Sequence, residues 1–437
     1  MGRAASRGEG HSPASIVQPR ALEGHMETFK GSYYKKICRN EGDGQEDMLD
    51  FANMVFGVSG ECIDFGAFYP KAYSGARCGL VTHHVMEEHG KIRALVDSYP
   101  FTMRLRTGAQ ADSGMELKAV YIGTVSVHPL TRNKGYMTAL MERAQSDALA
   151  QGCALMLLDG NRHRYQHYGF ERAGIRYSFH VAFRNVRHCC AALYGREYME
   201  RPRYCFEEIE GGDSPYLDAM FALYSRKNMV ARNRDDFWLC LQGGHAVTFA
   251  VLCGGQLAGY VSLSADEHNV LEFEMDEKEQ IPKMVYDLMA GTDSTQLGVD
   301  AGVDECGKIE FLEKMCNNYS ISMSHHMKIL DYEAVLTFLF GWKQRYVMLA
   351  ANDYVVGVKN TEDGKENNYL ISVREDGTKV TRTDTRADAV FGELEFVSML
   401  TTTLFFVEQQ KGDGGRLKNA PTGWFPLPFY LPEADAF

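Results

Sequence analysis

Apolar residues between positions 29 and 187 change from helical to strand-like spacing several times. A helix is predicted over Asp47–Phe56, where they recur three or four positions apart, at Met48, Phe51, Ala52 and Val55. Ala154–Leu158 is apolar throughout, as expected for a strand buried on both faces. Further strands are predicted near Leu80–Met86, Ile92–Pro100, Leu117–Val127 and Tyr177–Phe183, and helices at Thr138–Ala150 and Arg162–Tyr168.

Two more units are expected downstream. Residues 188–323 repeat this kind of pattern, with a hairpin, a strand and a helix at Ala246–Ser264, Val270–Met275 and Gln280–Met289. Residues 324–437 begin with a helix and continue through two strands, at Tyr332–Leu339, Tyr346–Val358 and Asn368–Val373. The predicted fold class is therefore α+β, with units over 29–187, 188–323 and 324–437. Residues 1–28 lack an apolar period, so we expect a disordered leader, with Met26 as an alternative start.

Composition narrows the function classes. The chain of 437 residues is 45% hydrophobic and 24% charged, an ordinary globular mixture. Its formal net charge of −12 argues against a nucleic-acid partner, because such proteins usually carry a basic excess. No apolar run is long enough to span a membrane, and no membrane partner is expected. The 11 cysteines lack paired CxxC spacing, which favours reduced thiols and a cytoplasmic location.

Two histidine pairs, His83-His84 and His325-His326, raise the question of a metal site. The first pair falls near an expected hairpin turn, and neighbouring side chains along a strand point to opposite faces. The second pair has no cluster of Cys or carboxylate residues at ligand spacing. We therefore expect no metal.

The segment Val125–Phe170 carries the strongest chemical signal. An apolar strand turns at Pro129 and enters a helix through Arg132-Asn133-Lys134-Gly135-Tyr136-Met137. The free N–H groups of a first helical turn and the helix dipole favour an anion there. Gly135 allows a close backbone approach, and the basic side chains supply positive charge. These residues alone fit any diphosphate, or an ordinary turn with solvated basic side chains.

Arg132-x-x-Gly135, placed after Val125-x-Val127-x-Pro129, resembles the acetyl-CoA pyrophosphate loop of GNAT-type N-acetyltransferases, in particular the Eis-like branch. Met137 stands where the family usually has Gly or Ala. Tyr165, followed by Tyr168-Gly169-Phe170, also resembles that branch. The resemblance implies acetyl-CoA as co-substrate, and the candidate binding residues are Val125, Ser126, Val127, Arg132, Asn133, Lys134, Gly135, Tyr136, Met137, Thr138, Gly160 and Asn161.

The closing segment, Ala420–Phe437, is rich in proline and aromatic residues. Its four prolines forbid a regular helix, and its aromatic rings are costly to leave in water, so we expect an extended tail docked on apolar surface. Most docked tails are purely structural. The resemblance to Eis-like proteins implies more: a sterol-carrier-like third domain, the Phe437 carboxylate inserted into the acetyltransferase site, and a homo-oligomer, commonly a hexamer.

The second unit has carboxylates where a pyrophosphate loop would stand, at Glu272, Glu274, Asp276, Glu277 and Glu279. So many negative charges repel a diphosphate. We therefore expect a second GNAT-like domain that does not hold CoA, with a structural or pocket-forming role.

Acetyl transfer assigns roles to the candidates. Tyr165 is the candidate general acid towards the CoA sulfur, because a phenol with a pKa near ~10 stays protonated at neutral pH; the alternative is a core aromatic residue packed on Phe170. The Phe437 carboxylate is the candidate base, with a water relay or selection of the neutral amine as alternatives. A nucleophilic Cys153 is less favoured, since a small thiol in a strand is more often core.

Two functions follow. The first is an N-acetyltransferase that acts on a primary amine, of a small cationic molecule or of a lysine, by direct transfer in a ternary complex. The second is a non-catalytic protein that senses acyl-CoA or lipid. The first is favoured, because a sensor needs neither Tyr165 nor a free terminal carboxylate.

Overall fold

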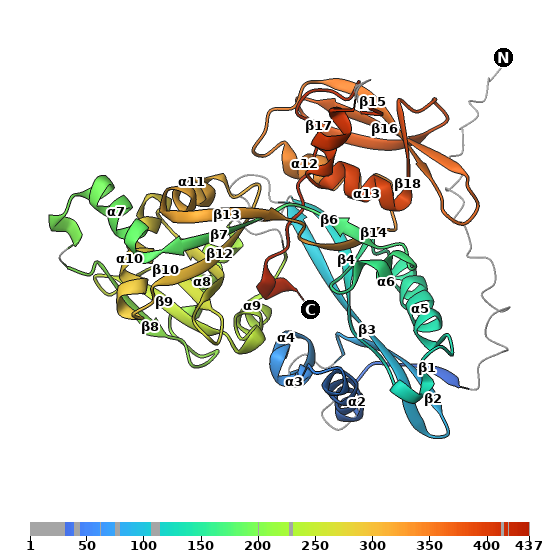
Figure 1. Cartoon of the computed structure of the whole chain (residues 1–437), viewed down its shortest axis with the longest axis horizontal. Coiled ribbons are helices and arrows are strands. Elements are labelled where there is room, and N and C mark those ends of the chain that lie inside the picture. The colour runs from blue at the N-terminus through green and yellow to red at the C-terminus, as the bar shows by residue number, and fades with distance from the viewer. Residues whose placement is uncertain are drawn as a thin grey trace, which may run out of the picture.

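The computed structural model of the chain describes residues 31–38, 44–61, 63–74, 79–105, 114–199, 201–226, 230–411, 415–417 and 419–436. Three bodies are seen in Figure 1, each built on one β-sheet, and the C-terminal segment enters the space where they meet. The mixed α and β content agrees with the predicted class. None of the helices in the described part of the chain combines the length and the apolar character needed to cross a lipid bilayer.

The first sheet contains seven strands in the order β1-β2-β3-β4-β5-β14-β6. Their bounds are β1 Ser32–Lys36, β2 Thr82–Glu88, β3 Lys91–Leu105, β4 Met115–Val127, β5 Leu155–Leu158, β14 His325–Ile329 and β6 Glu171–Ala173. Only β4 and β5 run parallel; the other neighbours are antiparallel. The accompanying helices are α2 Gln45–Val58, α3 Phe65–Phe68, α4 Pro70–Tyr73, α5 Tyr136–Ala150 and α6 Arg162–Gln166.

The second sheet has the order β13-β7-β12-β11-β10-β9-β8. Its strands are β13 Cys316–Ser322, β7 Arg176–Ala182, β12 Gln296–Gly302, β11 Asn269–Met275, β10 Gln256–Leu263, β9 Val247–Cys253 and β8 Tyr204–Glu208. Its helices are α7 Phe183–Tyr194, α8 Leu217–Ser225, α9 Arg234–Leu241, α10 Ile281–Gly291 and α11 Cys306–Met315. Again one neighbouring pair is parallel, β11 with β12, so the second sheet repeats the pairing pattern of the first.

The first two sheets exchange one strand each. β14 follows the last strand of the second sheet in sequence but pairs with β5 and β6 of the first. β7 follows β6 but pairs with β12 and β13 of the second sheet. The expected boundaries at residues 187 and 323 stay a prediction. β7 lies before the first boundary but pairs in the second sheet, and β14 lies after the second boundary but pairs in the first sheet. The exchange ties the two bodies together through main-chain hydrogen bonds.

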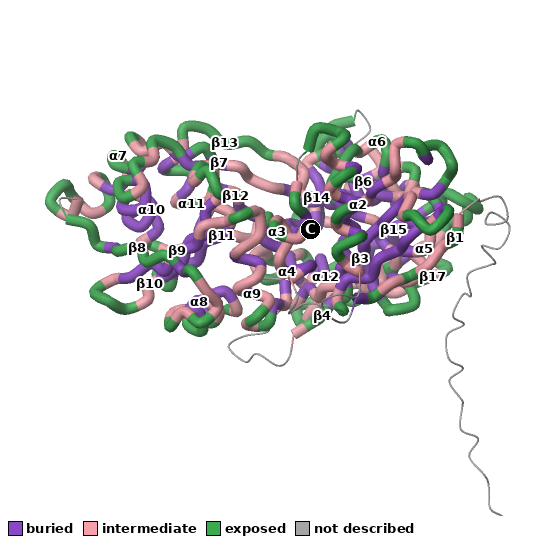
Figure 2. Tube along the Cα trace, turned by 90° about the horizontal axis from the view of Figure 1, so that it is seen from below, coloured by how far each residue is buried: buried purple, intermediate pink, exposed green. Residues whose placement is uncertain are grey.

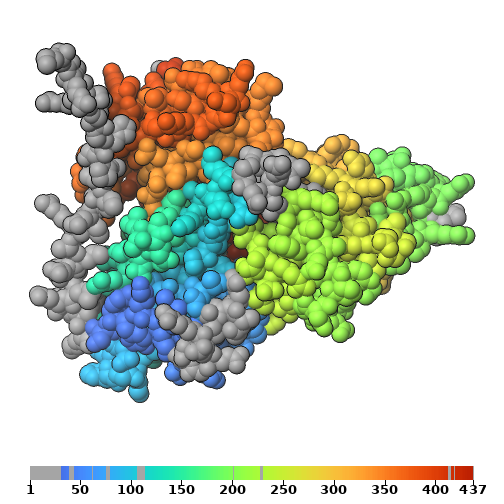
Figure 3. Space-filling view, turned by 180° about the vertical axis from the view of Figure 1, so that it is seen from behind, coloured from blue at the N-terminus to red at the C-terminus, as the bar shows by residue number. Residues whose placement is uncertain are grey.

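The third sheet has the order β17-β16-β15-β18, with bounds Gly377–Thr383, Glu366–Arg374, Asn352–Lys359 and Ala389–Gly392. Its helices are α12 Tyr332–Lys343, α13 Glu393–Thr401 and α14 Leu404–Gln409. The strand predicted over Tyr346–Val358 begins later than expected, at Asn352. In Figure 3 this body (orange) lies above the other two, and dark-red atoms of the C-terminal segment are visible in the crevice between them.

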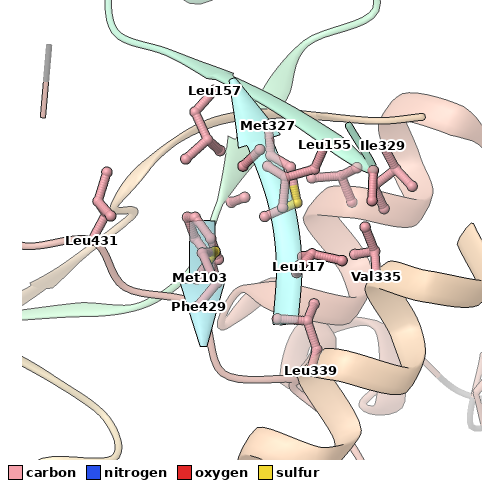
Figure 4. Close-up of a cluster of buried hydrophobic side chains, with 14 of the residues drawn as sticks. Met103, Leu117, Leu155, Leu157, Met327, Ile329, Val335, Leu339, Phe429 and Leu431 are labelled. Carbon is pink, nitrogen blue, oxygen red and sulfur yellow. The ribbon is translucent and has the colours of Figure 1, made fainter. Parts of the chain in front are cut away.

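The short strand β5 is buried on both faces, as predicted. Leu155 and Leu157 face a core shared with α12 and the C-terminal segment, whereas Met156 and Leu158 face the core under α5. Figure 4 shows the shared core, where Ile329 of β14 lies near Val335 of α12, and Phe429 of the C-terminal segment lies near Met103 of β3. In Figure 2 buried positions follow strands such as β3, while β13 is largely exposed.

The C-terminal segment docks on apolar surface, as predicted, and most of its described residues are in neither a strand nor a helix; one turn of 3-10 helix interrupts it at Glu433–Asp435. Its large rings are buried, at Trp424, Phe425, Phe429 and Tyr430. Lys343 of α12 donates to the carbonyls of Trp424 and Pro426, at 3.1 and 2.6 Å. The backbone N–H of Ile175 donates to the carbonyl of Phe429 at 3.1 Å. The segment is therefore held by both the first and the third bodies.

The first histidine pair lies within β2, and the hairpin turn falls later, at His89-Gly90, where both residues have positive φ. The two rings point apart, as expected for neighbours on a strand. His83 faces Asp97, at 2.8 Å between Nδ1 and Oδ1, and His84 lies against Tyr33 and Ser98.

Candidate active site

Strand β4 separates from β5 halfway along its length. The two strands pair only at Ala119–Tyr121 of β4. Beyond this point Thr124 has a positive φ of 46°, and the register between β3 and β4 shifts in the same region. A bulge of this kind bends a strand and re-aims its backbone. The backbone of Ile122–Val127 is thereby left without a strand partner on the β5 side.

Helix α5 begins just after β4, at a glycine. Gly135 is its N-cap, in the left-handed conformation with φ 78°, and no side chain caps the first turn. Asn133, two residues earlier, also has a positive φ of 65°. Because the first N–H groups of a helix have no partner within it, this terminus is open to an anion and carries partial positive charge. The anion site at this loop stays a prediction, and the uncapped helix start is compatible with it.

A cavity of about 670 Å³ lies at this helix terminus. It is large enough for a substantial part of a cofactor. The predicted residues that line it are Val125, Val127, Arg132, Asn133, Lys134, Gly135, Tyr136, Met137 and Thr138. The loop, the helix start and the free part of β4 therefore face one cavity.

Three predicted cofactor residues are not part of its lining. The Ser126 side chain is buried and donates to the carbonyl of Thr124 at 2.8 Å. Asn161 caps α6 by accepting from the N–H of Arg164. Gly160 has a φ of 140°, and a Cβ there would lie 2.6 Å from the Tyr165 ring. The geometry thus gives each of the three a local structural role.

The sequence did not indicate the rest of the cavity lining. It comes from the end of α2 and the residues just after it, and from α6 and the turn after it: Val55, Phe56, Ser59, Glu61, Arg164 and Tyr168. The periodic pattern predicted α2 and its buried face, but local spacing does not show where the end of a helix docks. Thr131 completes the lining beside the loop.

The two basic side chains of the loop are not equivalent. Lys134 forms an ion pair with Glu88 of β2, at 2.9 Å, and the Tyr136 hydroxyl donates to the same carboxylate. Arg132 is exposed at the cavity. Arg132 is therefore the better counter-charge for a diphosphate, and Glu88 offsets part of the charge of Lys134.

Tyr165 lies beneath the cavity rather than in its wall. It is 5% exposed, and its ring packs edge-on against Phe170 at 6.5 Å between centroids. Burial raises the pKa of its phenol, which keeps the group protonated at neutral pH. The neighbouring Tyr168 does line the cavity, with its hydroxyl 3.3 Å from Thr138 Oγ1. The second candidate catalytic residue, Phe437, lies outside the described residues, which reach Ala436.

Three polar residues meet at the carboxyl end of β5. The Tyr121 hydroxyl donates to Asp159 at 2.8 Å, and Nδ1 of His325 donates to the same carboxylate at 2.9 Å. Burial alone would raise the pKa of Asp159, but the hydrogen bond and charge of His325 lower it below its ordinary value. The sequence singled out His325 only as half of a pair, because its partner lies 166 residues away.

A cluster of three or more side chains suited to a metal ion does not occur within the described ranges. The nine cysteines of the same ranges are free thiols, and burial raises the pKa of Cys153. A raised pKa lowers the thiolate fraction, which disfavours Cys153 as a nucleophile.

Comparison with known proteins agrees with this geometry. Residues 41–173 match the sequence family described as an acetyltransferase (GNAT) domain, a domain type that uses acyl-CoA. A search among curated proteins finds no match. Eis1 from Mycobacterium abscessus has a similar structure, with 15% identity and a TM-score of 0.61, over 93% of this chain and 100% of that chain.

Two further solved structures are similar over the same extent. A GCN5-related N-acetyltransferase from Anabaena variabilis shares 12% identity, with a TM-score of 0.62 over 93% of this chain and 100% of its own. A conserved protein from Enterococcus faecalis, described as a probable N-acyltransferase, shares 14% identity, with a TM-score of 0.61 over 92% and 98%. At such identities the likeness concerns the fold. Residues 41–173 form a GNAT acetyltransferase domain, and the protein is an N-acetyltransferase.

Proposed function

We propose that the protein transfers an acetyl group from acetyl-CoA directly to a primary amine, with both substrates bound together. The observation that carries this proposal is the cavity of about 670 Å³ that joins the uncapped start of α5 to the free part of β4. The diphosphate of acetyl-CoA would bind the N–H groups of α5, with Arg132 as its counter-charge. The backbone of Val125–Val127 would bind the pantetheine arm and stabilise the acyl oxyanion.

Two groups would move protons during the transfer. Tyr165 would protonate the departing CoA thiolate, a role that a phenol can take because it keeps its proton at neutral pH. The Phe437 carboxylate would accept the amine proton, directly or through water. This role is supported by the buried course of the preceding residues, since Ala434, Asp435 and Ala436 are all buried.

The acceptor would be a cation, either a small cationic molecule or a lysine side chain. The net charge of −12 favours the approach of such a substrate. By analogy with Eis-like proteins, we further propose a sterol-carrier-like third domain and a homo-oligomeric, cytoplasmic protein. The nine free thiols of the described ranges fit a reducing compartment.

The proton donor is tested by comparing two neighbouring tyrosines. Tyr165→Phe should lower kcat by about a hundredfold or more and leave acetyl-CoA affinity unchanged, because general acid catalysis contributes on that order. Tyr168→Phe removes the hydroxyl that lies on the cavity wall. If Tyr168→Phe loses turnover while Tyr165→Phe keeps it, Tyr168 is the acid.

The alternative function, a non-catalytic sensor of acyl-CoA or lipid, makes a different prediction for the chain terminus. Extending the protein by a few residues beyond Phe437 should abolish amine acetylation by the enzyme and leave a sensor unaffected. Amidation of the terminus removes the charge alone. Undiminished turnover by the amidated protein would show that the carboxylate is not the base.

A further inference from the structure

His325 joins two segments that are far apart in the sequence. It lies on β14, is 4% exposed, and has a hydrogen-bond acceptor at each ring nitrogen. Nδ1 faces both carboxylate oxygens of Asp159, at 2.9 and 3.0 Å. Nε2 faces the carbonyl oxygen of Leu431, in the C-terminal segment, at 3.1 Å.

This geometry specifies the charge of the ring. A neutral imidazole carries one N–H, so one of its nitrogens would present a lone pair to an oxygen lone pair. Only the imidazolium donates at both positions. The other titratable groups near it are Tyr121 on β4, whose hydroxyl lies 3.2 Å from Nδ1, the adjacent His326, and Glu433 in the C-terminal segment. Burial favours the neutral ring, but Asp159 and the Leu431 carbonyl raise the pKa of His325 above its ordinary value.

The Leu431 contact lies between two other groups of anchors on the C-terminal segment. Upstream, the N–H of Leu427 donates to the carbonyl of Leu400, in the third body. Downstream, Lys71 donates to the carbonyl of Ala434 at 3.0 Å, and Arg232 pairs with Asp435 at 2.7 Å. At Leu431 itself the carbonyl faces His325, and the N–H donates to the hydroxyl of Ser324 at 3.3 Å. His325 links this point of the segment to Asp159 at the carboxyl end of β5, beside the point where β4 and β5 separate.

We propose that His325 is a positioning residue: its imidazolium ties the C-terminal segment to Asp159 and so sets where the last residues lie relative to the acyl group. The effect on turnover rests on the proposed role of the Phe437 carboxylate. The tie itself does not, and it can be measured without any acetyl acceptor.

The tie depends on pH with a definite sign. Because the pKa of His325 in the folded protein is above its ordinary value, the tie is complete at pH values below the ordinary pKa of 6.5 and is lost as the pH rises through the folded value. Removing the charge of the Asp159 carboxylate removes the interaction that stabilises the protonated form of His325. Asp159→Asn should therefore shift the loss of the tie to lower pH.

Hydrogen exchange followed by mass spectrometry tests the tie in the full-length protein. In His325→Gln, the N–H groups of Leu431, Asp435 and Ala436 should exchange about tenfold faster, as expected when a buried hydrogen bond from a charged donor is lost. Leu427 should keep the parent rate, because its partner belongs to the third body.

The matched control is His326→Gln, on the same strand. Both ring nitrogens of His326 are buried and make no hydrogen bond to the described residues, so its substitution should leave the exchange of the segment unchanged. After correction for intrinsic exchange, the exchange rate of these amides in the parent protein should rise with pH. Asp159→Asn should move this rise to lower pH, and His325→Gln should abolish it.

The proposal is overturned if His325→Gln leaves these three amides at the parent rate, or if Asp159→Asn does not move the pH of the rise. Turnover is a separate readout. If exchange responds as expected and kcat falls with acetyl-CoA affinity unchanged, both proposals stand. If exchange responds and kcat does not, the tie stands and the catalytic role of the terminus fails.

Discussion

Gly135→Asp is the sharpest perturbation of the cofactor site. The substitution places a carboxylate at the N-cap of α5, where the diphosphate would bind the first turn. Asp tolerates the left-handed conformation better than most residues, so the backbone is only mildly strained. The principal effect is therefore repulsion between two negative groups.

The size of that repulsion follows from the position of Gly135, which is exposed at the cavity rim. Two unit charges about 5 Å apart repel by about 1 kcal/mol in water and about 3 kcal/mol at an effective dielectric constant of about 20. The dissociation constant of acetyl-CoA should then rise by between about fivefold and about 150-fold. The loss should shrink as salt is added, because salt screens exposed charges.

Calorimetric titration with acetyl-CoA measures this loss, and Gly135→Asn is the matched control. Asn has nearly the shape of Asp and also tolerates positive φ, but it carries no charge. It should stay within a few-fold of the parent affinity. Unchanged binding by the Asp variant, or equal losses in both variants at every salt concentration, would refute an anion site at the start of α5.

Three further predictions concern stability. Gly160→Ala should lower the unfolding free energy by about 1–3 kcal/mol, since its Cβ would meet the Tyr165 ring at 2.6 Å and its φ is 140°. Arg232→Met should cost about 3–5 kcal/mol in urea unfolding, because it leaves two buried carboxylates unpaired. Burial would lower the pKa of His83, but Asp97 raises it to about 10. The stability gained from this ion pair is therefore complete below pH 6.5, and it is lost as the pH rises through about 10. The stability difference between the parent and His83→Gln should shrink over that range.

Each of these has a control or an opposing result. Gly377 has a φ of 142° with no atom within 4 Å of an added Cβ, so Gly377→Ala isolates backbone strain from the ring contact. If both Ala variants lose the same free energy of unfolding, the Tyr165 ring moves aside to accommodate the added Cβ at Gly160. If Arg232→Met leaves the free energy of unfolding unchanged, the two carboxylates are protonated or hydrated in the variant. If the stability difference between the parent and His83→Gln does not change with pH, the ion pair between His83 and Asp97 does not stabilise the fold.

Local patterns predicted the elements that depend on local spacing. The apolar stripe of α2 is buried where expected, and β5 is covered on both faces. The loop before α5 was found because an anion site at a helix start needs residues close together in sequence. The docking of the C-terminal segment followed from its composition, since aromatic rings without helix or strand pairing need an apolar surface.

Long-range pairing was not visible in the sequence. β7 and β14 have ordinary strand patterns, and nothing in them indicates that each pairs in the neighbouring sheet. Three of the five acidic residues counted against CoA binding in the second unit pair with cations that are distant in the sequence. Glu272 pairs with Arg232, Glu274 with Lys308 and Asp276 with Arg226. The repulsion inferred for that unit is therefore weaker than a count of carboxylates implies.

The site was predicted unevenly for the same reason. The cavity wall formed by the loop and by α5 is contiguous in sequence, whereas the wall from α2 and the group of Tyr121, Asp159 and His325 are assembled only by the fold. Tyr165 was found through a resemblance, and its position beneath the cavity became visible only in three dimensions.

The central claim is that acetyl-CoA donates its acetyl group to a primary amine on this protein. The most direct test incubates the purified protein with acetyl-CoA labelled in the acetyl carbons and with a panel of primary amines, and follows both free CoA and labelled amide by mass spectrometry. The account predicts labelled amide in an amount equal to the CoA released, and little CoA release without an amine. Tight binding of acetyl-CoA with no labelled amide from any amine would contradict it.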